Sequence, residues 1–212
     1  MKTTTSSRQA STKKPGRSDE LVNVASDLFM ERGFESVTIK DIAQRLGVNT
    51  ALIYYYFKNK EDLLRAAIEN LVDQALQTYE QIHAKHDHPQ DVINDWIDTH
   101  VQLRDPIRKL VKISLDYRGL RRKSRKIDKA IDRFYENERD ILTQVIRKGM
   151  DKEIFQTVDA SGLAAFISMH LDGIMVASVI RPEIDSTSAM EYLRGVVWRS
   201  LGVKQTAIKH KR

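Results

Sequence analysis

Hydrophobic positions along the chain recur at the spacing of three and four residues that helices require, and no segment alternates convincingly with the period of two. The pattern therefore predicts an all-α protein of about nine helices. A first helix runs through Leu21, Val24, Leu28 and Phe29 and ends near Gly33. After two short helices, longer ones are expected at about 60–83, 89–103, 106–119, 127–149, 159–180 and 186–201.

The two short helices lie in residues 37–60 and have the pattern of a helix-turn-helix. Thr38 and Asp41 have the spacing of a capping box, which predicts that a helix begins at Thr38. Gly47 supplies the backbone freedom that ends this helix, and Asn49 is a good N-cap for the second one. Inward positions of the second helix are Leu52, Ile53, Tyr56 and Phe57, and outward positions are Thr50, Ala51, Tyr54 and Tyr55. That outward face is what a recognition helix offers to a major groove.

A longer ordered set of residues extends this pattern on both sides. It comprises Ala25, Leu28, Phe29, Gly33, Phe34, Val37, Thr38, Ile42, Ala43, Gly47, Val48, Ile53, Tyr54, Tyr56, Phe57, Lys60, Glu61, Leu63 and Leu64. With these residues, the segment from Ser18 to Val72 resembles the DNA-binding domain of the TetR family of bacterial transcriptional regulators. The remaining chain resembles the family only in length, helicity and the placing of the last two helices.

The resemblance implies an N-terminal three-helix DNA-binding domain and a C-terminal helical domain for effector binding and dimerisation. The expected boundaries are a flexible basic arm at 1–17, the DNA-binding domain at 18–72, the ligand-binding and dimerisation domain at 73–204, and a basic tail at 205–212. The arm carries five cations and no acid, which accounts for most of the net charge of +6. It is either a solubilising tail or an arm that contacts phosphates or the minor groove.

The expected DNA contacts follow from the resemblance and from the chemistry of helix ends. Thr38 sits at a helix N-terminus, where exposed amides favour a phosphate, and Lys60 resembles the family's phosphate clamp. Residues that open a recognition helix usually reach base edges. Tyr56, in contrast, is expected in the core. The full set of expected contacts is Thr38, Lys40, Asn49, Thr50, Ala51, Tyr54, Tyr55 and Lys60.

Composition bears on the location of the protein and on the kinds of site it can contain. The chain is 41% hydrophobic and 30% charged, as is ordinary for a soluble protein, and no apolar run is expected to cross a membrane. The polar N-terminus does not resemble a secretory signal, and the sequence holds no cysteine, so disulfides and thiolate metal sites are excluded. We expect a cytoplasmic protein. No catalytic or phosphate-loop motif is present, so neither enzymatic activity nor a cofactor is expected.

Two charged clusters have competing interpretations. His83, His86 and His88 invite a metal site, but their spacing matches no strong ligand motif, so we expect a solvated loop and no metal. Six cations lie between Arg118 and Lys126. They form either a solvated connection or an anion site, for an acidic effector such as an acyl-CoA or for DNA phosphates.

The resemblance predicts a homodimeric, ligand-responsive regulator, expected to be a repressor that binds a palindromic operator and is released by a small-molecule effector of anionic or hydrophobic character. The alternative is a ligand-independent DNA-bound scaffold, which an exposed partner groove would favour over a closed cavity. Large or polar side chains on apolar faces are candidate ligand contacts, although each has an ordinary core role as its competing interpretation: Trp96, His100, Tyr117, Phe134, Tyr135, Arg139, Phe166 and His170. Apolar positions of the last two helices predict a four-helix dimer interface at Leu163, Ile167, His170, Leu171, Ile174, Ser178, Leu193, Val197 and Leu201.

Overall fold

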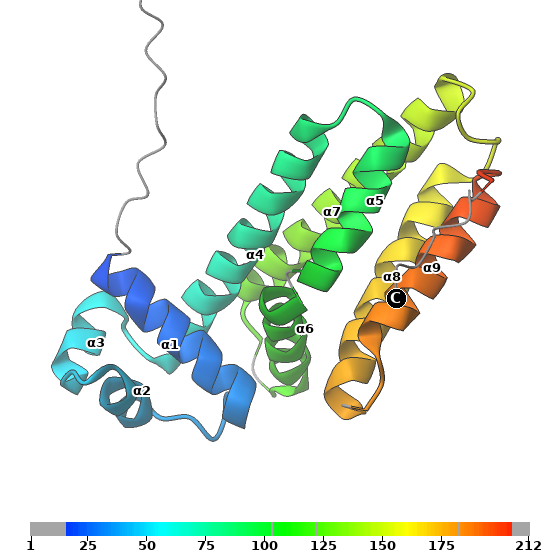
Figure 1. The fold of residues 1–212 in the computed structure, drawn as a ribbon. Coiled ribbons are helices and arrows are strands. Elements are labelled where there is room, and N and C mark those ends of the chain that lie inside the picture. The colour runs from blue at the N-terminus through cyan, green and yellow to red at the C-terminus, as the bar shows by residue number, and fades with distance from the viewer. Residues whose placement is uncertain (1–15, 103, 122, 182, 205–212) are drawn as a thin grey trace, which may run out of the picture.

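The computed structural model describes residues 16–102, 104–121, 123–181 and 183–204, and within these ranges it contains nine α-helices and no strand (Figure 1). The all-α prediction is therefore confirmed. The helices are α1 Arg17–Arg32, α2 Ile39–Leu46, α3 Thr50–Tyr56, α4 Lys60–Lys85, α5 Pro89–Gln102, α6 Arg104–Gly119, α7 Arg125–Asp151, α8 Ala160–Ile180 and α9 Ser186–Ser200. Nearly all of the expected N-terminal arm, and the whole of the C-terminal tail at 205–212, lie outside the described residues.

Helices α1, α2 and α3 form a small unit at one end of the molecule, packed on the first turns of α4 (Figure 1). Its core is apolar and fully buried, because each helix turns its hydrophobic stripe inward. The core residues include Leu21, Leu28, Phe29, Ile42, Ile53, Leu63 and Leu64. Helix α4 continues without a break into the rest of the molecule, so the expected boundary near residue 72 falls inside a helix that both units share.

The larger unit is built around α7, which packs against α4, α5 and α8, while α9 packs on α8 and α5. Helix α6 lies between the two units, in contact with α1 on one side and with α4 and α8 on the other. It begins at Arg104, two residues before the start expected at Pro106. Proline is tolerated in the first turn of a helix, where no intrahelical N–H bond is lost, so Pro106 did not mark the first residue.

Helix α8 departs from one sequence expectation, that no segment would resemble a membrane span. Over its 21 residues it reaches a mean hydropathy of 1.8, so by length and composition alone it meets the criteria for a membrane span, which we had not expected anywhere in the chain. Only 22% of that window is buried, and the helix packs against α6, α7 and α9. Its outer face leaves Met169 64% exposed and Ile180 71% exposed. Helix α8 is apolar on its inner and outer faces, and this accounts for both observations.

The predicted dimer interface needs correction for five residues. Ile167, Leu171, Leu193, Val197 and Leu201 are buried within one protomer, so they are core residues and are not available to a partner. Their periodicity marks the contact of α8 and α9 with each other and with the rest of the same chain. Of the other predicted residues, Leu163, Ile174 and Ser178 are half-buried and His170 is exposed, and these stay predictions.

Candidate DNA-binding surface and interior polar site

The first helix of the helix-turn-helix begins as predicted. The Thr38 hydroxyl accepts the Asp41 backbone N–H at 3.2 Å, and a carboxylate oxygen of Asp41 accepts the Thr38 backbone N–H at 2.8 Å. These two bonds complete the capping box, and the hydroxyl also donates to the carboxylate at 2.6 Å. Hydrogen bonds from the Thr38 side chain and backbone hold the pKa of Asp41 below its usual value. The N-terminal end of α2 is therefore fixed by the side chains of Thr38 and Asp41.

The turn and the start of the recognition helix also follow the sequence prediction. Gly47 adopts the left-handed conformation, with φ 70° and ψ 34°, which a side chain would disfavour. The Asn49 side-chain oxygen accepts the Leu52 backbone N–H at 3.0 Å and so caps α3. This cap uses the oxygen of Asn49, whose amide N–H groups are left to serve as donors to a base or phosphate.

Helix α3 presents a polar and aromatic outer face. Thr50 and Ala51 are exposed, Tyr54 is 56% exposed and Tyr55 is 81% exposed, whereas Ile53 and Phe57 are buried beneath them. Tyr56 was expected in the core, but it is 40% exposed and its ring lies edge-on to that of Tyr55, with centroids 5.0 Å apart. The helix has only seven residues, and Ile53 and Phe57 supply the buried side chains beneath it. Tyr56 therefore joins the candidate DNA-facing residues.

Lys60 has contacts that the resemblance did not imply. Its ammonium donates to the backbone carbonyls of Phe34 and Val37 at 2.8 Å each and to that of Glu35 at 3.3 Å. It also lies 4.3 Å from the centroid of the Phe34 ring. An ammonium has three N–H donors, and three carbonyls account for them. The expected phosphate contact stays a prediction, and the described contacts give Lys60 a positioning role between α4 and the α1–α2 loop.

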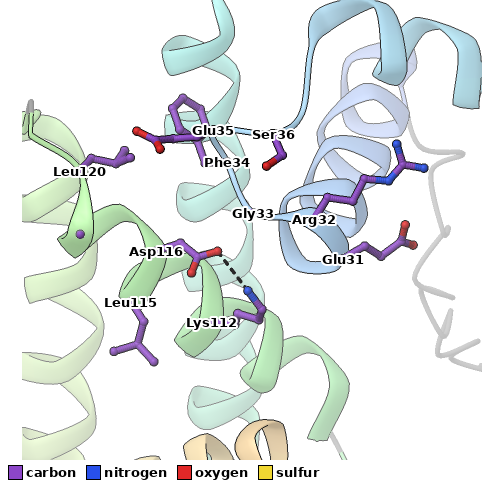
Figure 2. Close-up of a pocket in the computed structure, with 11 residues that line it drawn as sticks. Glu31, Arg32, Gly33, Phe34, Glu35, Ser36, Lys112, Leu115, Asp116 and Leu120 are labelled. Carbon is purple, nitrogen blue, oxygen red and sulfur yellow. Dashed lines mark hydrogen bonds and ion pairs between the residues drawn. The ribbon is translucent and has the colours of Figure 1, made fainter.

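Helix α6 joins the small unit to the large one across a groove of about 620 Å³ (Figure 2). One wall is the end of α1 and the loop after it, at residues 31–36, and the other is α6 from Lys112 to Gly119 and the adjoining Leu120. In Figure 2, Lys112 and Asp116 lie along the α6 wall, joined by a 3.1 Å ion pair. A further ion pair joins Lys109 of α6 to Asp27 of α1. A displacement of α6 would therefore act directly on the helix that supports α2 and α3.

A polar network lies inside the larger unit. The Tyr79 hydroxyl is 3.0 Å from His100 Nε2, and His100 Nδ1 is 2.8 Å from the Trp96 carbonyl oxygen. His100 Nε2 lies 3.7 Å from a carboxylate oxygen of Glu138, and the other carboxylate oxygen accepts the Ser168 hydroxyl. Tyr79, Trp96, His100 and Glu138 are all at least 98% buried. The network thus places a buried carboxylate among aromatic rings contributed by three helices.

A second carboxylate lies beside this network, on α8. Burial, followed by repulsion from Glu138, raises the pKa of Asp172 to about 6, and a hydrogen bond from Tyr135 opposes this shift. Asp172 and Tyr135 line a cavity of about 260 Å³ between α6, α7 and α8. Val111, Ser114, Leu115 and Arg118 of α6 form its opposite wall.

The candidate ligand residues therefore divide into groups. Trp96, His100 and Phe134 lie in or against the buried network, and Tyr135 lines the cavity. Tyr117 lies elsewhere: its hydroxyl accepts the Ser124 N–H at 2.8 Å and fastens the α6–α7 connection. Arg139 and His170 are exposed, and Phe166, half-buried, stacks on His170 with centroids 3.8 Å apart.

Sequence reasoning missed Tyr79, Glu138, Ser168 and Asp172. Glu138 lies one turn from Phe134 and Leu142 on the apolar face of α7, and Asp172 is the sole Asp, Glu, Lys or Arg in the 21 residues of α8. A carboxylate on an apolar face was the available signal for both.

The two charged clusters have internal partners. His86 Nε2 lies 2.7 Å from Asp95, and within the described residues no group of three or more metal-binding side chains occurs. Arg118 pairs with Asp128 at 3.1 Å and with Asp132 at 3.5 Å, and Lys123 donates to the last carbonyls of α6. Arg122 lies outside the described residues. At least two of the six cations are therefore engaged in closing the α6–α7 connection.

Comparison with known proteins shows which protein family this chain resembles. Residues 21–67 match the model of bacterial regulatory proteins of the tetR family. An uncharacterised helix-turn-helix transcriptional regulator of Bacillus subtilis, YfiR, is 28% identical over 169 residues, which are 76% of this chain and 80% of YfiR. The chain carries a TetR-type DNA-binding domain. It is a DNA-binding transcriptional regulator, and α1–α3 with the start of α4 are its TetR-type DNA-binding domain.

Other relatives match over different lengths. The KstR2 repressor of Mycolicibacterium smegmatis is 33% identical over 66 residues, only 31% of this chain and 32% of KstR2. Among solved structures, a Saccharomonospora viridis regulator in complex with choline has a TM-score of 0.79 at 21% identity, covering 89% of this chain and 98% of that one. FadR of Bacillus subtilis in complex with stearoyl-CoA has a TM-score of 0.71 at 18% identity, covering 86% and 98%. These structural likenesses establish the shared TetR-type fold.

Proposed function

We propose that this protein is a cytoplasmic, homodimeric repressor that binds a palindromic operator through α3 and is released by a small-molecule effector bound in the larger unit. The observation that carries the proposal is the position of α6. Leu115 lines both the cavity beside Asp172 and the groove against the DNA-binding domain. A ligand that displaces α6 would therefore change the position of α1 and, through it, of α3.

The DNA contacts proposed here are the residues at both ends of the helix-turn-helix. Thr38, Asn49, Thr50 and Ala51 stand at helix N-termini, where amides and small side chains admit phosphates and base edges. Exposed Tyr54, Tyr55 and Tyr56 extend the same face, with Lys40 on the preceding helix. One helix of seven residues contacts few base pairs. Two copies of α3 about one turn of DNA apart, roughly 34 to 36 Å, would contact enough base pairs to specify one operator sequence.

The dimer is proposed to form on the outer face of α8. Exposed Met169 and Ile180, with exposed His170 and half-buried Ile174, present apolar surface that one protomer leaves uncovered. Exposed Gly173 lies on the same helix and would admit a close neighbour. Covering this face with its symmetry mate would bury it without new polar groups.

The relatives support a ligand-responsive protein over a ligand-independent scaffold. One protein of the same fold was solved in complex with choline and another in complex with stearoyl-CoA. The cavity between α6, α7 and α8 of this chain favours the same choice. The ligands of those two proteins differ in charge, so the effector class must be argued from this chain's own residues.

A direct test uses a fluorescent duplex that carries the DNA upstream of the protein's own gene. The proposal predicts specific binding that a scrambled duplex does not match, and a loss of binding when an effector is added. By linkage the effector must then bind more weakly to the DNA complex, by a factor in the range of 5 to 150. Equal affinity for both duplexes would contradict the proposal.

A further inference from the structure

We propose that the cavity between α6, α7 and α8 binds a small organic cation, with the carboxylate of Asp172 in its wall and that of Glu138 behind it as the negative charges. This inference rests on the proposed function, because it names the effector class. It replaces the anionic or hydrophobic effector that the sequence suggested.

Charge is the first argument. Within the described residues, no lysine or arginine forms an ion pair with Asp172 or Glu138, although Glu138 is 2% exposed. A buried carboxylate that lacks a cation carries a large desolvation cost. Burial, and after it repulsion from Glu138, raises the pKa of Asp172. A cation placed beside Asp172 would remove this repulsion, and an anion would add to it.

His100 does not change this balance. A carbonyl oxygen only accepts hydrogen bonds, so His100 Nδ1 donates to the Trp96 carbonyl. His100 Nε2 lies 3.0 Å from the Tyr79 hydroxyl and 3.7 Å from a carboxylate oxygen of Glu138. Even a protonated His100 would offset only one of the two carboxylates.

Arg118 lines the cavity, but its guanidinium already forms ion pairs with two acidic side chains. Its guanidinium pairs with Asp128 and Asp132, and it is 49% exposed. The cavity wall therefore holds one guanidinium, that of Arg118, and two carboxylates, those of Asp132 and Asp172, while Asp128 lies outside it. The net charge of this wall favours a cation.

Aromatic side chains supply the second argument. Tyr135, in the cavity wall, packs edge-on against Phe134 with centroids 5.0 Å apart, and Phe134 lies 6.0 Å from Tyr79. Tyr79 in turn stacks on Trp96 at 3.9 Å. Aromatic faces attract organic cations, most strongly where water is excluded.

Size is the third argument. At about 260 Å³ the cavity lies just below the range of roughly 300–1,000 Å³ that holds drug-sized ligands. Few heavy atoms can enter, and an acyl-CoA is too large for this cavity. The geometry thus points to a compact ammonium compound.

Three compounds of nearly equal shape isolate the effect of charge. Choline, 3,3-dimethylbutan-1-ol and 3,3-dimethylbutyrate carry a positive, neutral and negative group on similar carbon skeletons. We expect isothermal titration calorimetry on the full-length protein to give at least tenfold tighter binding for choline than for either of the others. Equal or preferred binding of the alcohol or the carboxylate would overturn the proposal, as would absence of binding by choline, tetramethylammonium and tetraethylammonium at 10 mM.

A pair of variants assigns the charge to its residue. Asp172→Asn keeps the shape of the side chain and should weaken choline binding at least tenfold, and it should abolish the preference over the alcohol. Asp140→Asn makes the same change at an exposed position of α7 and should leave both affinities unchanged. Retained preference for choline in a folded Asp172→Asn protein would remove Asp172 from the site.

Binding to the upstream duplex, measured on the same samples, separates this inference from the proposed function. A protein that binds its operator but is released only by neutral or anionic compounds would retain the function and overturn the cation site. A protein that binds choline but shows no sequence preference on DNA would overturn the function and retain the site.

Discussion

At the scale of single residues, side chains with charge in apolar surroundings determine the properties of this protein. Lys60 and Asp172 are the clearest cases, since three carbonyls hold the Lys60 ammonium, and burial followed by repulsion from Glu138 raises the pKa of Asp172. The sequence indicated that Lys60 mattered but assigned it only a phosphate. It could not reveal the carbonyls, because they come from a loop 23 to 26 residues earlier in the chain.

Replacing Lys60 tests its positioning role. Lys60→Ala should lower the free energy of unfolding by about 1–3 kcal/mol, because partly buried carbonyls lose a charged donor. Lys58→Ala, at an exposed position two residues earlier, should have little effect. Urea denaturation measures both. An unchanged midpoint for Lys60→Ala, with weaker DNA binding and a flatter salt dependence, would assign Lys60 to a phosphate alone.

The raised pKa of Asp172 predicts a pH dependence of stability. A carboxyl with a higher pKa in the folded state than its ordinary value of 3.8 binds its proton more tightly when folded. The stability it contributes is present below pH 3.8 and is lost as the pH rises through about 6, by about 3 kcal/mol. Asp172→Asn should therefore gain stability relative to the parent protein between pH 4.5 and 7. Parallel stability curves for the two proteins would contradict this prediction.

At the scale of elements, helix starts were predictable and helix faces were less so. The N-caps Thr38 and Asn49 act within three residues, so local sequence contains the whole interaction. The apolar stripe of α8 marks both the buried side, with Ile167 and Leu171, and an outer side that one protomer leaves exposed. Periodicity alone cannot separate a contact within the chain from a contact with a second copy. Tyr56 was misplaced for a related reason, since a helix of seven residues has room for few inward side chains.

The outer face of α3 supports a prediction on DNA affinity. Tyr56→Ala should weaken binding to the upstream duplex about tenfold while leaving the unfolding midpoint nearly unchanged, because the ring is 40% exposed. Tyr192→Ala removes an exposed tyrosine from α9 and serves as the control. A large loss of stability in Tyr56→Ala would restore the original core assignment.

In the whole molecule, the proposed regulation requires two copies of the chain. It also requires contacts through which the larger unit can move the DNA-binding domain. Helix α4 is continuous through both units, and α6 contacts α1 through the Lys109–Asp27 pair. The sequence predicted both domains and the connecting role of α4. The position of α6 depends on contacts between distant segments, and no local pattern revealed it.

A charge on the outer face of α8 should separate the protomers. Met169→Glu should give a folded monomer with much weaker operator binding, because Met169 is 64% exposed on the apolar face. Tyr55→Glu places the same charge on exposed surface of α3 and should bind DNA poorly but remain dimeric. Sedimentation velocity and circular dichroism distinguish these outcomes. If the Met169→Glu protein is dimeric at micromolar concentration, the dimer interface does not include this face of α8.

Sequence-specific DNA binding by a pair of α3 helices can be measured by selecting bound duplexes from a random library. We expect enrichment of two inverted half-sites whose centres lie about 10 base pairs apart or a multiple of that spacing. We further expect that Thr50→Ala changes the preferred bases while the spacing is kept. Recovery of sequences with no shared motif, or of a single half-site with no symmetric partner, would contradict sequence-specific binding by paired α3 helices.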